Sequence, residues 1–90
     1  MYGKGRAKGL VRFLHRPDGT AWTVAVAGDF SDWRPVAMKR RADGTFVRHV
    51  PVPSGTFEYK FVVDGKWVTD GDHSAWSFNA YGTFNSVGRA

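Results

Sequence analysis

The segment TFEYKFVVDGKWV, from Thr56 to Val68, decides the fold of this chain. Every second residue of its first part is apolar, and a β-strand directs such residues to one face. The inward set is Phe57, Tyr59, Phe61 and Val63. Asp64-Gly65 then forms a two-residue hairpin turn, because both residues tolerate a left-handed backbone. We therefore expect a strand over residues 56–63 that returns at once into a second strand, 66–68.

Shorter runs on both sides of this hairpin have the same character. Turn signals at Pro17-Asp18-Gly19 and Asp43-Gly44 separate them. In the run from Trp22 to Ala27, large and small residues alternate, which predicts that Trp22, Val24 and Val26 point inward. The expected strands cover residues 9–15, 22–27, 36–39, 45–50 and 81–87, besides the hairpin. About seven short strands predict an immunoglobulin-like antiparallel β-sandwich over residues 9–90, preceded by a flexible basic arm, 1–8.

The composition agrees with an all-β domain and excludes several classes of function. The chain has 90 residues, enough for one small domain. Its apolar residues are mainly valine and the 14 aromatics, which favour strands over helices. Without cysteine there can be no disulfide, thiolate metal site or thiol nucleophile, and a cytoplasmic location is favoured. No apolar run approaches the roughly 20 residues of a membrane span, so we expect no membrane partner.

The net charge of +5 raises the question of nucleic acid. The positive residues gather in the first sixteen residues and at Lys39-Arg40-Arg41, away from the aromatic residues that a single strand would stack on. We therefore expect no nucleic-acid partner.

Three aromatic residues fall outside the alternation that builds the core. Trp33 lies in a polar loop, Trp67 directly follows the Asp-Gly turn, and Tyr81 ends a long polar segment. Each could cap an edge of the core or form part of a binding platform. Polar residues accompany them: Lys60 faces away from Tyr59 and Phe61, and Thr83 and Asn85 alternate with Phe84. Aromatic faces beside such groups are a typical, though not unique, composition of a carbohydrate site.

The chain resembles the family-48 carbohydrate-binding module. This family includes the glycogen-binding domain of the AMP-activated protein kinase beta subunit, and it is also found at the N-terminus of isoamylases and branching enzymes. The resemblance runs in order from Gly9 to Val87. Five segments show it: AGDFSDW (27–33), MK (38–39), DGTF (43–46), GTFEYKFVVDGKWVTD (55–70) and YGTFNSV (81–87).

The resemblance implies a sandwich that binds α-1,4-linked glucans such as glycogen, starch or maltodextrin. Trp33 and Trp67 would cradle the curved chain, and Lys60 would hydrogen-bond its hydroxyls. Thr83 and Asn85 would add polar contacts. Tyr81 stands where the kinase modules have a leucine that pushes into the glucan.

Other functions remain as alternatives. Asp70, Asp72 and His73 could suggest a metal or acid–base site, but we expect a solvated loop there, no catalysis, no metal and no cofactor, since so small a sandwich offers little concavity. The main alternative is a free-standing protein-interaction domain. It would dock onto a separately encoded glucan-metabolising enzyme or kinase, without binding glucan itself.

Overall fold

A computed structural model of the chain describes residues 2–4, 9–17, 19, 21–53, 55–70, 76–78 and 84–89. One 3-10 turn, η1 (Asp29–Ser31), follows the third strand. The strands are β1 (Tyr2–Lys4), β2 (Leu10–His15), β3 (Val24–Gly28), β4 (Val36–Ala37), β5 (Lys39–Arg40), β6 (Phe46–Pro51), β7 (Thr56–Val63), β8 (Lys66–Val68), β9 (Trp76–Phe78) and β10 (Phe84–Arg89).

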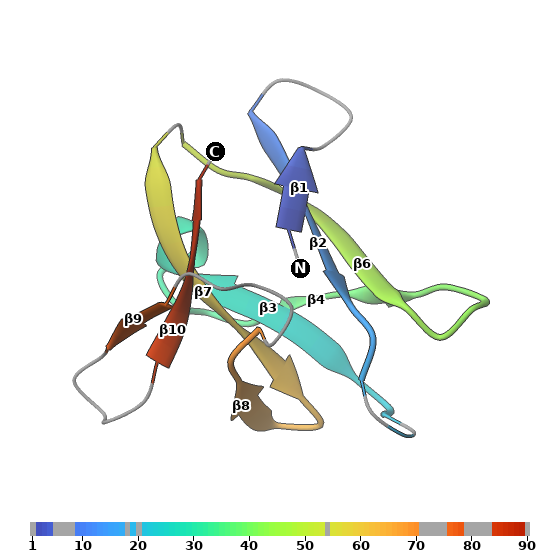
Figure 1. The fold of residues 1–90 in the computed structure, drawn as a ribbon. Coiled ribbons are helices and arrows are strands. Elements are labelled where there is room, and N and C mark those ends of the chain that lie inside the picture. Colours follow the sequence, from blue (N-terminus) through green and yellow to red (C-terminus); the bar gives the residue numbers. More distant parts are fainter. Residues whose placement is uncertain are drawn as a thin grey trace.

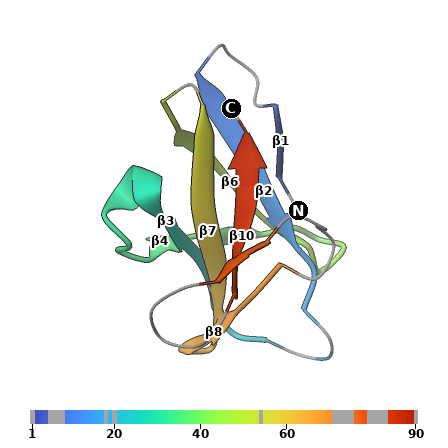
Figure 2. The same cartoon turned by 60° about the vertical axis from the view of Figure 1, so that its left-hand side comes forward.

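The strands form two antiparallel sheets that face each other (Figure 1). One sheet has the order β1-β2-β6-β5. The other has the order β4-β3-β7-β10-β9, and β8 pairs with β7. The view in Figure 2 places β7 and β10 in front of β2 and β6. The expected antiparallel β-sandwich of immunoglobulin-like type is confirmed, with β7 at the centre of its sheet.

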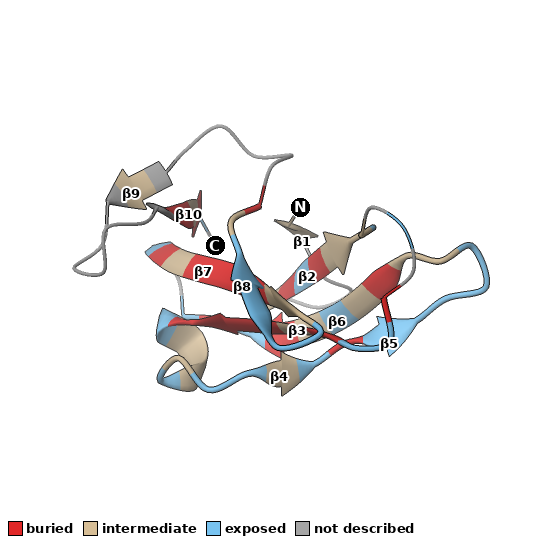
Figure 3. Cartoon of the chain, turned by 90° about the horizontal axis from the view of Figure 1, so that it is seen from below, coloured by how far each residue is buried: buried red, intermediate tan, exposed pale blue. Residues whose placement is uncertain are grey.

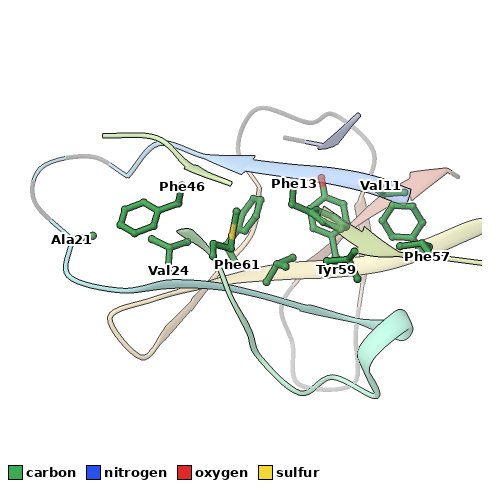
Figure 4. Close-up of a cluster of buried hydrophobic side chains, with 12 residues drawn as sticks. Val11, Phe13, Ala21, Val24, Phe46, Phe57, Tyr59 and Phe61 are labelled. Atoms are coloured by element: carbon green, nitrogen blue, oxygen red, sulfur yellow. The ribbon is translucent and has the colours of Figure 1, made fainter. Parts of the chain in front are cut away.

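The core lies between the sheets and is built mainly of valine and aromatic rings (Figure 4). Phe13 of β2 meets Tyr59 and Phe57 of β7 edge-on, with ring centroids 5.2 and 5.9 Å apart. Val26 and Phe61 are wholly buried. The inward side of β7 therefore matches the predicted alternation, and the residues between, such as Lys60, belong to the outward face.

The expectation that Trp22 points into the core is wrong. Its side chain is 88 % exposed, whereas Val24 and Val26 are buried as expected. Strand β3 begins only at Val24, because the backbone N–H groups of Trp22 and Thr23 both donate to the side chain of Asp64 rather than to a neighbouring strand. The alternation therefore cannot be extended back to Trp22.

Two strands lie where the sequence indicated none. Within the expected flexible arm, β1 pairs with β2, and the Tyr2 ring packs edge-on against Phe57 at a centroid distance of 5.5 Å. Residues 5–8 of that arm lie outside the described residues. Strand β9, in the segment expected to be a polar loop, pairs with β10. The described residues contain no helix long and apolar enough to cross a membrane.

Candidate functional site

The outward face of β7 brings residues from four strands into register. Ala27 of β3 lies opposite Lys60, and Ala25 lies opposite Val62. On the other edge of β7, Trp67 of β8 also lies opposite Val62. Directly opposed residues of an antiparallel pair share a face, so Ala25, Val62 and Trp67 form one outward row. Small alanines on β3 leave the larger side chains of β7 and β8 to shape this face.

Lys60 and Asn85 form the next row of the same face. Strand β10 pairs with β7 through Ser86 opposite Tyr59, so one further step of that register sets Asn85 beside Lys60. Both side chains are buried, at 7 % and 8 % exposure. The Asn85 amide donates to Glu58 Oε1 at 3.2 Å, which fixes its orientation. Lysine commonly buries its aliphatic stem while its ammonium group reaches water.

Trp67 is held by the hairpin register. Asp64 and Gly65 both have positive φ, 49° and 83°, as the predicted two-residue turn requires. Strand β8 then pairs with β7 over three residues. Figure 3 shows β8 as exposed throughout, beside the buried part of β7. Trp67 itself is 49 % exposed, so much of its indole is accessible to a ligand.

The chain just after β8 is anchored in the core. Asp70 is 1 % exposed and accepts a hydrogen bond of 2.6 Å from the Tyr59 hydroxyl. Its backbone N–H donates to Ser86 Oγ of β10 at 3.0 Å. Burial, and then the hydrogen bond to Asp70, raise the pKa of the Tyr59 phenol above its ordinary value. The expectation of a solvated loop is therefore wrong for Asp70. Asp72 and His73 lie outside the described residues.

Trp33 is held by a loop rather than by a strand. Its backbone N–H donates to the carbonyl of Gly28 at 2.9 Å, and its indole Nε1–H donates to Asp29 Oδ1 at 3.1 Å. The second carboxylate oxygen of Asp29 accepts the backbone N–H of Glu58 at 2.8 Å. The β3–β7 ladder ends with the pair Gly28 and Tyr59. The Asp29 side chain therefore adds one more hydrogen bond between the two segments, just beyond the last backbone pair. One carboxylate therefore ties the Trp33 indole to the beginning of β7.

The backbone at Trp33 is strained. Asp32 and Trp33 have φ values of 52° and 61°, a left-handed conformation that costs residues other than glycine about 1 kcal/mol or more each. The Ser31 hydroxyl braces the loop, since it accepts from Gly28 N at 3.3 Å and lies 2.9 Å from the Arg34 carbonyl, to which it can donate. The indole is half-buried, and its N–H is engaged by Asp29, so what remains for a ligand is its apolar surface.

The structure describes four of the six predicted site residues, three on the outward face of β7 and one tied to the beginning of that strand. Lys60, Trp67 and Asn85 lie on that face, and the Asp29 carboxylate holds Trp33 beside Glu58. Tyr81 and Thr83 lie outside the described residues. Sequence reasoning missed Asp29 and Glu58 as the residues that orient Trp33 and Asn85. Asp29 reaches Trp33 only four residues away, but its bond to Glu58 and that of Glu58 to Asn85 join segments 29 and 27 residues apart, which no local pattern marks.

This arrangement combines apolar ring surfaces with hydrogen-bonding groups along one side of β7. Successive rows on one side of a strand are about 6.6 Å apart, so Glu58, Lys60 and Val62 mark a line of roughly 13 Å. Trp33 is tied to its first row and Trp67 lies in its last. Among the described residues, no group of three or more histidine, aspartate or glutamate side chains could hold a metal ion. The face is suited to binding an elongated ligand with apolar faces and hydroxyl edges.

Comparison with known proteins gives matches to one family of sequences. A family model described as the glycogen recognition site of AMP-activated protein kinase matches residues 12–88. The 5'-AMP-activated protein kinase subunit beta-1 of Sus scrofa is 35 % identical over 60 residues, which cover 61 % of this chain and 48 % of that protein. Its Bos taurus counterpart is 32 % identical over 77 residues, or 80 % of this chain and 28 % of that protein.

A plant protein matches over a shorter stretch. The SNF1-related protein kinase regulatory subunit beta-2 of Arabidopsis thaliana is 36 % identical over 44 residues, which cover 49 % of this chain and 15 % of that protein. The chain therefore spans less than half the length of each of these curated relatives.

Proposed function

The chain belongs to the family described as the glycogen recognition site of AMP-activated protein kinase, and on this premise we propose that it is a non-catalytic module that binds α-1,4-linked glucan. Glycogen, starch and maltodextrin are the ligands of this class. The observation that supports the proposal most strongly is the half-exposed indole of Trp67, set by the hairpin on the same face as Lys60 and Asn85. A sugar ring has an apolar C–H face and a rim of hydroxyls, which matches that combination.

Each residue has a distinct role in the proposed complex. Trp33 and Trp67 stack against sugar rings at the two ends of the line along β7 and form a bent platform. Lys60 and Asn85 donate hydrogen bonds to hydroxyls between them. Tyr81 and Thr83 close the site. A curled α-1,4 chain fits a bent platform better than a flat β-1,4 chain does.

The affinity should be weak and nearly independent of salt. Few side chains contribute, and an open face leaves much of the ligand in contact with water. Glucan is uncharged, so its binding releases no counterions, whereas nucleic-acid binding by a domain of net charge +5 would weaken steeply with salt. Salt dependence therefore separates these two kinds of ligand.

The proposal extends to a partner class and a location. The matched relatives are named as subunits of protein kinases. A protein kinase or a glucan-metabolising enzyme is therefore the partner that we propose, in the cytoplasm, where this module would bring the enzyme to its glucan. Glucan binding does not depend on that partner.

Native gel electrophoresis with amylose or glycogen in the gel tests the proposal. The wild type should be retarded relative to a gel without glucan or with a soluble β-1,4-glucan, and Trp33→Ala/Trp67→Ala should lose most of the retardation. Thermal unfolding of both proteins controls for folding. An unretarded wild type would contradict the proposal and favour the protein-interaction domain. Equal retardation of the double variant would show that the ligand binds elsewhere.

A further inference from the structure

Trp22 is an exposed aromatic residue that neither the core nor the proposed site uses. Among the described residues, the large apolar side chains that remain exposed are Trp22 at 88 %, Trp67 at 49 % and Val68 at 37 %. Burying apolar surface stabilises a fold by about 25 cal/mol per Å². An indole left almost wholly in water therefore contributes little to folding. It is accessible to a ligand instead.

The backbone that presents Trp22 is fixed in place. Asp64 Oδ1 accepts the N–H of Trp22 at 2.9 Å and the N–H of Thr23 at 2.8 Å. In return, the N–H of Asp64 donates to the carbonyl of Thr23 at 3.0 Å. Three hydrogen bonds thus clamp the segment before β3 to the β7–β8 turn. A side chain on such a prearranged backbone loses less conformational entropy when a ligand binds.

The same turn positions Trp67. Trp67 comes three positions after Asp64, and three residue steps of chain span at most about 11 Å. Two exposed indoles are therefore attached to segments that meet at one carboxylate. In Figure 1, β8 and the segment that leads into β3 lie at the same end of the molecule, below the rest of the sandwich.

The surroundings of Trp22 favour a carbohydrate over a protein surface. Thr23 and Asp64, which share the clamp, and Lys66 of the same hairpin are all exposed and carry hydroxyl, carboxylate and ammonium groups. The centres of protein interfaces are depleted in lysine and aspartate. An aromatic face with a polar rim repeats the composition of the outward face of β7. A glucan chain that is longer than the central site extends beyond Trp67 and has further sugar rings that can be bound.

We propose that Trp22 is an outer contact for the α-glucan, which stacks a sugar ring of a chain that continues past Trp67. This inference rests on the proposed function, since it assigns a further subsite to the same ligand. The contact is made only by chains long enough to reach from the central site to Trp22. The module would therefore discriminate by chain length, binding long outer chains more tightly than short oligosaccharides.

The test compares long and short ligands on the same variants. Affinity electrophoresis in amylose gels gives the dissociation constant for long chains, and competition by maltotetraose gives that for a short one. Trp22→Ala should weaken amylose binding about fivefold, the factor to which roughly 1 kcal/mol corresponds, and leave maltotetraose competition unchanged. Trp22→Phe should retain most of the affinity, and Trp22→Leu should not. Arg40→Ala, exposed on the opposite sheet, is the control and should bind as the wild type.

The outcomes separate this inference from the proposed function. A wild type that binds neither ligand contradicts both. A wild type that binds amylose, together with an equally tight Trp22→Ala, overturns the outer contact alone. Equal weakening for both ligands would also overturn it, because Trp22 would then act on the central site. If Trp22→Leu binds as the wild type does, ring stacking is excluded.

Discussion

Trp33 and Trp67 stand at opposite ends of one line along β7, but the molecule fixes them in different ways. Trp67 lies on a strand, where the register of a two-residue hairpin sets its position. Trp33 lies in a loop with a left-handed backbone, where the carboxylate of Asp29 holds its indole. The hairpin depends on its turn and on the buried anchor at Asp70, whereas the Trp33 indole is held by one exposed side chain, that of Asp29.

This difference implies that each end of the site can be loosened without replacing either tryptophan. Removing Asp29 should free Trp33 and leave Trp67 in place. Disturbing the turn or the Asp70 anchor should have the opposite effect. Each variant below affects one of the two regions, and each has a matched partner elsewhere in the chain.

Tyr59→Phe should have the largest effect, on the hairpin side. It removes the 2.6 Å hydrogen bond to the buried carboxylate of Asp70. Hydrogen bonds to buried charged groups contribute about 2 kcal/mol, so the free energy of unfolding should fall by that amount in urea titrations. The control is Tyr2→Phe, which removes the acceptor of a hydrogen bond from the Arg89 backbone and should lower the free energy of unfolding less. An equal loss in both variants would contradict the anchor.

The same anchor predicts a pH dependence. The pKa of Tyr59 is raised in the folded state, mainly by burial, so the phenol ionises more readily in the unfolded chain. Its contribution to stability is complete below about pH 10 and is lost as the pH rises above that value, by at most about 1.4 kcal/mol per pH unit. Unfolding measured between neutral pH and pH 11 should show this loss in the wild type. Tyr59→Phe should lack that part of it.

Asp29→Ala should have the next largest effect, on the loop side. It leaves both the Trp33 indole N–H and the Glu58 backbone N–H without their acceptor. We expect a loss of about 1 kcal/mol in stability and a roughly fivefold weaker affinity for amylose. Asp43→Ala is the control, because Asp43 also caps a backbone N–H, that of Thr45. It should leave glucan affinity unchanged; a fall equal to that of Asp29→Ala would rule out a specific action through Trp33.

Gly65→Ala should have the smallest effect, again on the hairpin. Its φ of 83° is unfavourable for alanine, at a cost of about 1 kcal/mol, although no neighbouring atom obstructs the added methyl group. Gly44→Ala is matched to it, with a φ of 87° in the Asp43-Gly44 turn. Both variants should lose similar stability in thermal unfolding. Only Gly65→Ala should also weaken amylose binding, since only that turn positions Trp67.

The sequence predicts the hairpin end of the site better than the loop end. Alternation and the Asp-Gly turn are local patterns, so β7, β8 and the outward direction of Lys60 follow from the amino-acid sequence alone. The attachment of the Trp33 loop to β7 does not, because the Asp29 carboxylate that holds the indole also binds Glu58, 29 residues further along the chain. The exposure of Trp22 could not be predicted for a related reason. It depends on the hydrogen bond from the Trp22 backbone N–H to the Asp64 side chain, 42 residues further along the chain.

The strands β1 and β9 also escape prediction. Each has only three residues, and each pairs along a single neighbour, β2 or β10. Over so short a length, periodicity cannot distinguish a strand from a loop. Their formation depends on the sheet edge that the longer strands provide.

A titration of the ¹⁵N-labelled protein with maltoheptaose, followed by NMR, tests the central claim most directly. The account predicts progressive shifts of the indole N–H signals of Trp33 and Trp67 and of the amide signals of Lys60 and Asn85. The signals of β2 and β6 should stay unchanged, and a β-1,4 oligosaccharide should cause far smaller shifts. Shifts confined to the β2–β6 face, or equal responses to both sugars, would contradict a glucan site on the outward face of β7.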